Sequence, residues 1–193
     1  KNCLELLSRE SGPVLEDFPD GSPPGDIENE DWVCPINLSI PPDSTSDEDL
    51  VRRALEQEVA LIRPWYEESK KKRGGRTNVG VSGKTPEEIS GFLSSVLANR
   101  EETVSLIEGK SAAIAFKQMA DDLRYFYMEA AIAKPDNLAT DVQIGNWLWG
   151  ETILGKVLVA IRDWAMECEE PGFKALAPTA MVPMHQRHRT QHG

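Results

Sequence analysis

The chain has 193 residues, of which 40% are hydrophobic and 27% charged, and its formal net charge is −11. These values are typical of a soluble globular protein with one sizeable core. Residues 1–50 carry 13 acidic and two basic residues, whereas residues 51–193 carry 19 of each kind. The N-terminal quarter therefore holds the whole charge imbalance. This argues against nucleic acid as a partner, because phosphate binding needs a basic surface.

The sequence has no apolar run long enough to span a membrane and no signal-peptide pattern, so we expect a cytoplasmic protein that does not bind membranes. Its three cysteines, Cys3, Cys34 and Cys168, are widely separated. They match neither a disulfide framework nor a paired-cysteine metal site. We therefore expect reduced thiols, no metal and no cofactor.

Residues 1–46 contain seven of the thirteen prolines and most of the surplus acid. Within this segment, residues 32–40 (WVCPINLSI) form a short apolar stretch. A fully disordered tail does not usually contain such a stretch. The segment is therefore interpreted as an ordered acidic, proline-rich arm that packs on the rest of the protein, with a loose acidic part from Asp20 to Asp31.

The first two predicted helices have clear end signals. Ser46 and Asp49 fit an N-cap and its capping-box acid, and the helix that follows should end at Gly74-Gly75, with a kink at Pro64. Residues 85–88 (TPEE) are the strongest helix start in the chain, because threonine caps, proline fits the first helical position and glutamate fits the third. Residues 101–109 are expected to add a further helical piece.

A third helix is predicted from Ser111 to Lys134, before Pro135. Residues 141–168 have apolar side chains at helical spacing around most of the circumference, which predicts one continuous helix at the centre of a bundle. One more turn follows at residues 173–177, and residues 184–193 are expected to form a loose polar tail. The predicted fold is an all-α bundle of four or five helices over residues 47–183, with a largely non-helical N-terminal arm.

Glu151 is the first candidate functional residue, because it falls on the apolar side of residues 141–168, one turn after Trp147. A carboxylate buried alone in its charged form costs several kcal/mol, so it needs a partner or a proton. Arg124 or a tyrosine hydroxyl from residues 111–134 is the expected partner. A structural buried pair competes with a catalytic acid as the interpretation and is the more frequent arrangement.

Asp122, Tyr125 and Glu129 form a second candidate set, because steps of three, four and seven residues return to one side of a helix. Carboxylates in a bundle core can transfer protons or hold metals. The predicted core helices, however, contain no histidine to complete a di-metal motif, so no metal is expected. A solvated helix face is the simpler interpretation of Asp121, Asp122 and Glu129.

The basic run from Lys70 to Arg73 fits the end of a solvated helix, although it could also dock the acidic arm or an anionic ligand. Residues 80–85 (GVSGKT) superficially resemble a phosphate-binding loop. Asn78 stands where that pattern requires glycine, and Pro86 removes a backbone donor, so we do not expect nucleotide hydrolysis. The histidines of the C-terminal tail are not assigned to a metal site.

Two hypotheses of function follow. The favoured one is a non-catalytic accessory or assembly protein, whose acidic arm binds a protein partner with a basic surface while an apolar flank at Trp149 and Trp164 adds contact area. The alternative is a small enzyme or ligand-binding bundle with a pocket between residues 111–134 and 141–168. In that case the catalytic residues would be Glu151, Asp122 and Tyr125, and the ligand would contact Trp147, Arg124 and Glu129.

Overall fold

The computed structural model describes Ser8 and residues 48–99, 104–134 and 139–191. The chain divides into two units, residues 1–30 and 31–193. All of the helices described below belong to the second unit. Apart from Ser8, the predicted arm at residues 1–46 lies outside the described residues, as does the predicted N-cap Ser46.

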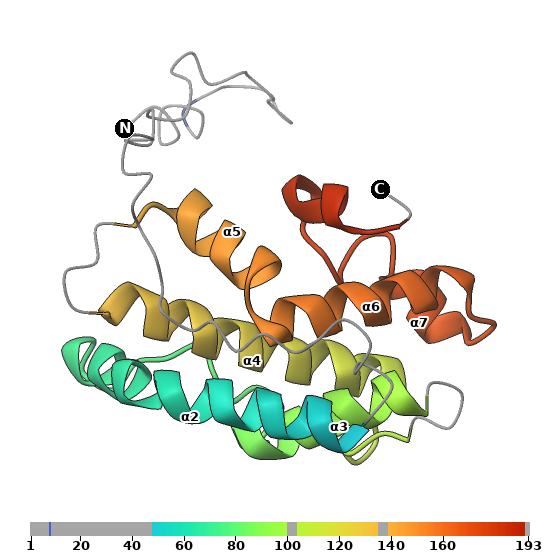
Figure 1. Cartoon of the computed structure of the whole chain (residues 1–193). Coiled ribbons are helices and arrows are strands. Elements are labelled where there is room, and N and C mark those ends of the chain that lie inside the picture. The colour runs from blue at the N-terminus through green and yellow to red at the C-terminus, as the bar shows by residue number, and fades with distance from the viewer. Residues whose placement is uncertain (1–7, 9–47, 100–103, 135–138, 192–193) are drawn as a thin grey trace. The chain divides into compact units, whose positions relative to one another are not determined.

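The described part of the chain is all-helical and contains no strand, which confirms the predicted fold class. Figure 1 shows how the helices are arranged. They are α2 (Glu48–Lys72), α3 (Pro86–Ala98), α4 (Ala112–Ala133), α5 (Asp141–Gly150), α6 (Ile153–Glu167), α7 (Pro171–Leu176) and the 3-10 helix η3 (Met184–Arg189). Within the described ranges, every helix is too short or too polar to cross a bilayer.

The starts of α3 and α4 follow the predicted capping signals. The Thr85 side chain accepts a hydrogen bond from the Glu88 amide, and the Glu88 carboxylate accepts one from the Thr85 amide at 2.7 Å. Ser111 caps α4 by accepting from the Ile114 amide. Residues 104–110 are not helical, so the further helical piece expected at 101–109 is wrong for the described part of that range.

Helices α2 and α4 lie side by side and run in the same direction (Figure 1). The Tyr127 hydroxyl donates to the Glu58 carboxylate, and the Lys134 ammonium lies over the Trp65 ring. Both pairs are separated by 69 residues, as parallel helices require. The chain returns between them through residues 73–85 and α3, which contacts both helices.

The most enclosed element is α4, not the segment 141–168 that the sequence placed at the centre. Thirteen of its 22 residues are buried, and it contacts α2, α3, α5 and α7. Residues 141–168 do not form one continuous helix, because α5 ends at Gly150 and the side chain of Thr152 caps a new helix by accepting from the Gly155 amide. The apolar periodicity was correct for each half, but it does not reveal the break.

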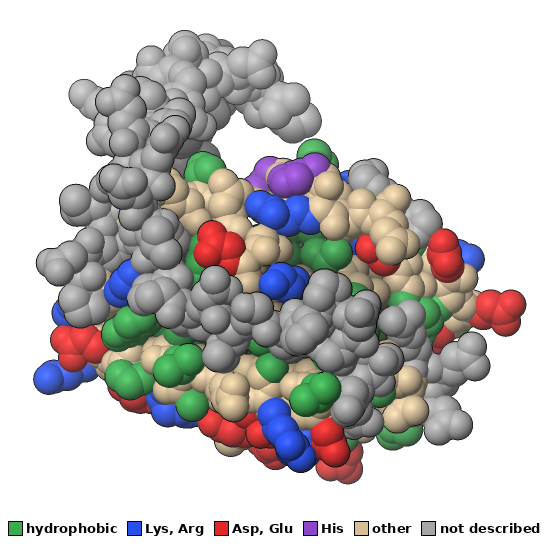
Figure 2. All heavy atoms as spheres, in the orientation of Figure 1, with side chains coloured by type: hydrophobic (Ala, Val, Ile, Leu, Met, Phe, Trp, Pro, Cys, Tyr) green, Lys and Arg blue, Asp and Glu red, His purple; other side chains and the backbone are tan. Residues whose placement is uncertain are grey.

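The described part of the predicted C-terminal tail contains the 3-10 helix η3 and contacts α5 and α6. Gln186 is buried, and its side-chain amide donates to the side-chain oxygen (Oδ1) of Asn146 in α5 at 3.0 Å. The Gln191 backbone amide donates to the Asp163 carboxylate of α6. Figure 2 shows histidine side chains of η3 beside basic side chains. Such specific polar contacts leave no periodic signal in a sequence.

Candidate functional site

Glu151 is exposed, so the prediction of a carboxylate enclosed by the bundle is wrong. It is the C-cap residue of α5, and its backbone amide donates to the Trp147 carbonyl at 2.9 Å. The chain turns here to begin α6, and the turn carries the Glu151 side chain out of the apolar stripe. Burial was the reason for proposing Glu151 as a catalytic acid, and that reason is removed.

The acid that is buried next to the first turn of α6 is Glu58 of α2, which has no exposed surface. Its carboxylate accepts hydrogen bonds from the Ile153 amide at 2.8 Å, the Leu154 amide at 3.3 Å and the Tyr127 hydroxyl at 2.9 Å. The first amides of a helix have no partner within the helix, and their dipoles favour a negative charge. Glu58 therefore caps α6 from a neighbouring helix; we call Glu58 and Tyr127 the α6 cap.

Burial changes the proton affinity of both members of the α6 cap. Burial raises the pKa of Glu58, although the hydrogen bonds from Ile153, Tyr127 and Leu154 act in the opposite direction. Burial, the charge of Glu58 and its hydrogen bond raise the pKa of Tyr127 well above its ordinary value. Tyr127 is therefore a neutral hydroxyl donor at physiological pH. Neither side chain reaches solvent, which makes the pair a structural support for α6.

The sequence interpretation missed Glu58, although α2 carries a signal that could have found it. Leu55, Val59 and Ile62 form the buried stripe of α2, and Glu58 lies three residues after Leu55 and four before Ile62. An acid at such a position is expected to face the core. Gln57, one residue earlier, is exposed.

Asp122 of α4 is buried and binds the loop before α3. Its Oδ1 accepts from the amides of Gly80 and Val81, both at 3.0 Å. Its Oδ2 accepts from the Ser82 amide at 2.8 Å and the Ser82 hydroxyl at 2.6 Å. Successive amides directed at one anion are the donor set that a phosphate loop would use. Here the chain's own carboxylate occupies the amides of residues 80–82, so they are not available to a phosphate group.

Glu129 holds the earlier part of the same loop. It is 3% exposed and accepts from the Thr77 hydroxyl at 2.8 Å and the Asn78 amide at 2.9 Å, and it pairs with Arg73. Asp122 and Glu129 thus share one face of α4, as their spacing predicted, but this face is not solvated. The expectation of a solvated face is wrong for both residues. We call Asp122 and Glu129 the loop clasp.

The other candidate residues do not converge on a pocket with Glu151. Tyr125 is 42% exposed and lies beside the loop clasp on α4 without joining it. Trp147 is buried in the core, with its ring 6.1 Å from that of Tyr127. The Arg124 guanidinium lies 5.4 Å from the Trp149 ring and pairs with Asp121 at 3.0 Å.

The predicted apolar flank at Trp149 and Trp164 is largely covered by the protein itself. Trp149 is 4% exposed, and Trp164 is half-buried with its ring 5.1 Å from that of Phe173 in α7. These tryptophans therefore stabilise the contacts of α5 with α4 and of α6 with α7. An apolar contact surface for a partner has to come from other residues.

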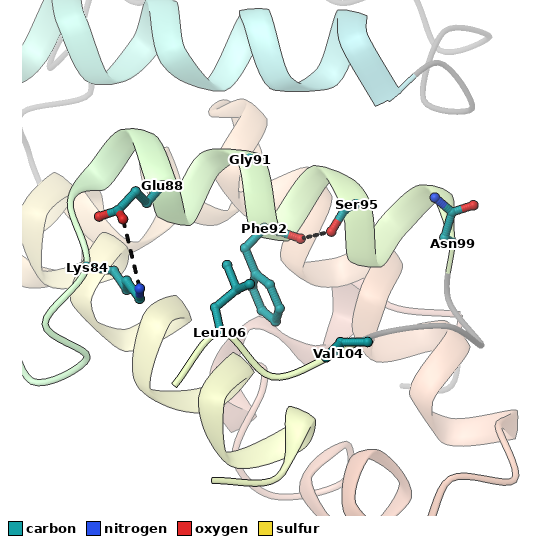
Figure 3. A pocket seen from close by; sticks show the side chains of 8 residues that line it. All are labelled: Lys84, Glu88, Gly91, Phe92, Ser95, Asn99, Val104 and Leu106. Carbon is teal, nitrogen blue, oxygen red and sulfur yellow. Dashed lines mark hydrogen bonds and ion pairs between the residues drawn. The ribbon is translucent and has the colours of Figure 1, made fainter. Parts of the chain in front are cut away.

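An open groove of about 590 Å³ lies between α3 and residues 104–106 (Figure 3). Phe92 is the buried part of its lining, while Val104 and Leu106 are 75% and 46% exposed. At one end, Lys84 and Glu88 form an ion pair at 3.9 Å. The groove offers apolar contact area beside the exposed carboxylate of Glu88.

Among the described residues, no group of three or more histidine, cysteine, aspartate or glutamate side chains could hold a metal ion. No family model matches the sequence, and neither a curated protein nor a solved structure matches it. Function is therefore inferred from the chemistry of this chain's own residues.

Proposed function

We propose that the protein is a non-catalytic accessory or assembly protein of the cytoplasm, which binds a protein partner with a basic surface. The observation that carries the proposal is the charge distribution, because residues 1–50 hold a net charge of −11 and the rest of the chain holds none. A strongly acidic segment on a neutral body attracts a basic partner over a distance and orients it. This attraction raises the association rate and weakens as salt is added.

The groove on α3 supplies the apolar part of this proposed interface. Val104 and Leu106 expose apolar surface that the protein's own core does not use, and Phe92 forms a firm base beneath them. Glu88, whose side chain is 51% exposed, lies at the rim. The expected occupant is an apolar side chain of the partner, flanked by a lysine or arginine that pairs with Glu88.

Three buried acids support a binding role over a catalytic one. Glu58, Asp122 and Glu129 are each saturated by donors from the chain itself, so their carboxylates are committed to the fold. The alternative of a small enzyme with a pocket between α4 and α5 relied on Glu151 and Asp122. The first is exposed and the second is bound to residues 80–82, so no observation favours that alternative.

The test begins with the full chain as bait, and the partner identified by mass spectrometry is then purified and bound back at 50 and 300 mM NaCl. One variant neutralises four acids of the arm: Asp26→Asn, Glu28→Gln, Glu30→Gln and Asp31→Asn. A control variant removes the same charge from exposed acids elsewhere: Glu67→Gln, Glu108→Gln, Glu151→Gln and Glu169→Gln. The arm variant should associate about tenfold more slowly at low salt, with little change in the control.

A second comparison tests the groove. Val104→Asp with Leu106→Asp should speed dissociation about tenfold or more, because a charge then faces the apolar contact. Val81→Asp with Val142→Asp places the same charges on exposed apolar positions elsewhere and should leave dissociation unchanged. Equal dissociation rates for the two double-aspartate variants would exclude the groove from the interface. Equal association rates for the arm variant and its control variant would reject the proposal itself.

A further inference from the structure

One face of α4 carries an apolar stripe made of Ile114, Tyr125 and Ile132, which are 42%, 42% and 57% exposed. These residues lie eleven and eighteen positions apart, close to three and five whole helical turns, so they share a face. The stripe is about 27 Å long at 1.5 Å per residue. On its other sides α4 contacts α2, α3, α5 and α7, so among the described helices none covers this face.

The charged side chains next to the stripe do not call for a basic partner. Asp121, which lies between Ile114 and Tyr125 on this face, pairs with both Lys117 and Arg124, so these three residues leave one net positive charge beside the stripe. A segment that covers the stripe should therefore be apolar on one side and carry no further positive charge.

Residues 32–42 are the matching segment of this chain. They contain no charged residue, although Asp31 and Asp43 bound them within an otherwise acidic region. From Ile36 to Ile40 apolar residues alternate with Asn37 and Ser39, the pattern of an extended chain with one apolar side.

The length of the chain also fits. Residues 32–40 span about 26 Å when extended, which matches the length of the stripe. Residues 41–47 connect them to the start of α2 and reach up to about 25 Å. Because α2 and α4 are parallel, α2 begins at the end of the bundle where the stripe begins at Ile114. The segment can therefore run along α4 from Ile114 towards Ile132, in the reverse chain direction.

We propose that residues 32–40 bind along the Ile114–Tyr125–Ile132 stripe of the same molecule. This inference goes beyond the proposed function, because it assigns an occupant to α4 whatever the external partner is. Residues 1–31, which precede this segment in the sequence, hold nine of the 13 acids of the first 50 residues. A short link of seven residues keeps the segment at a high local concentration beside its site.

The test uses the native thiol of Cys34 in the full chain, with Cys3→Ser and Cys168→Ser as background. The proposed direction places Cys34 near Ile132 and far from Ile114. Under mild oxidation, an Ile132→Cys variant should form the intramolecular disulfide about tenfold or more faster than an Ile114→Cys variant. Rates are read by non-reducing gels and mass spectrometry of the linked peptides. Similar rates for the two variants would show an undocked segment and overturn the inference.

A matched pair of charge variants tests which side of the segment is bound. Added to the Ile132→Cys variant, Ile36→Asp with Leu38→Asp should slow disulfide formation by Cys34 to the rate of the Ile114→Cys variant. Asn37→Asp with Ser39→Asp adds the same charge on the opposite side and should leave the fast reaction intact. Equal slowing by both pairs would argue against the proposed packing. Disulfide-linked dimers in place of the intramolecular bond would assign the stripe to a second copy and also overturn it.

Discussion

The α6 cap and the loop clasp use the same chemistry in two different surroundings. In each, a buried carboxylate of a long helix accepts hydrogen bonds from backbone amides of a distant segment. Glu58 holds the first turn of α6 inside the core, whereas Asp122 holds residues 80–82, of which Gly80 and Val81 are exposed. The comparison shows that the effect of removing a buried acid depends on which segment of the chain that acid binds. Loss of Glu58 should weaken the whole fold, and loss of Asp122 should first release a loop.

The largest effect is expected from Glu58→Ala. Three buried donors, from Ile153, Leu154 and Tyr127, would lose their acceptor, and each unsatisfied donor costs about 1–3 kcal/mol. We expect the free energy of unfolding to fall by about 4 kcal/mol, measured by urea denaturation. Gln57→Ala, at the exposed neighbouring position, should change it by less than about 0.5 kcal/mol. A small effect of Glu58→Ala would mean that water replaces the carboxylate.

Gly155→Ala tests the same region through packing. A Cβ atom at Gly155 would overlap the Leu148 carbonyl oxygen and lie 2.8 Å from the Trp149 Cα, so α5 and α6 would have to separate. We expect a loss of about 3 kcal/mol in unfolding free energy. Gly145→Ala is the matched control, because its Cβ would meet no atom closer than 3.8 Å. That variant should gain about 0.5–1 kcal/mol from better helix propensity, and equal losses in both would contradict the close approach of the two helices.

Asp122→Ala should have a smaller effect of about 2 kcal/mol, because water can reach the released amides of the loop. Hydrogen exchange should accelerate at Gly80, Val81 and Ser82, while the first turn of α6 stays protected. Asp121→Ala removes only partly exposed ion pairs and should cost less than about 1 kcal/mol. If Asp122→Ala instead accelerated hydrogen exchange uniformly throughout the protein, the loop clasp and the α6 cap would not act independently.

The smallest expected effect is the pH dependence of the α6 cap. The pKa of Glu58 is raised in the folded protein above its ordinary value of 4.5. Its contribution to stability is therefore complete below that value and declines as the pH rises through the folded pKa. The difference in unfolding free energy between the wild type and Glu58→Gln should shrink between pH 4 and pH 7. Measured denaturation curves that give a constant or growing difference would contradict the raised pKa.

Local signals in the sequence were sufficient for the helix class and for the starts of α3 and α4. The Thr85 capping box and the Ser111 cap are contacts within one turn of chain, so neighbouring residues specify them completely. The shared face of Asp122 and Glu129 also followed from helical spacing. The sequence does not predict the break after Gly150, because the apolar pattern continues through it. For the same reason it does not predict that Glu151 is exposed.

The amino-acid sequence by itself determined which segments are helical and how the charge is divided, because both depend on composition and on contacts of short range. Only the tertiary structure decided which acids are buried. Glu58 is 95 residues from the amide of Ile153, and Asp122 is 42 residues from that of Gly80. The partner of a buried carboxylate is set by the packing of helices that are distant in sequence, and helical periodicity carries no information about that distance.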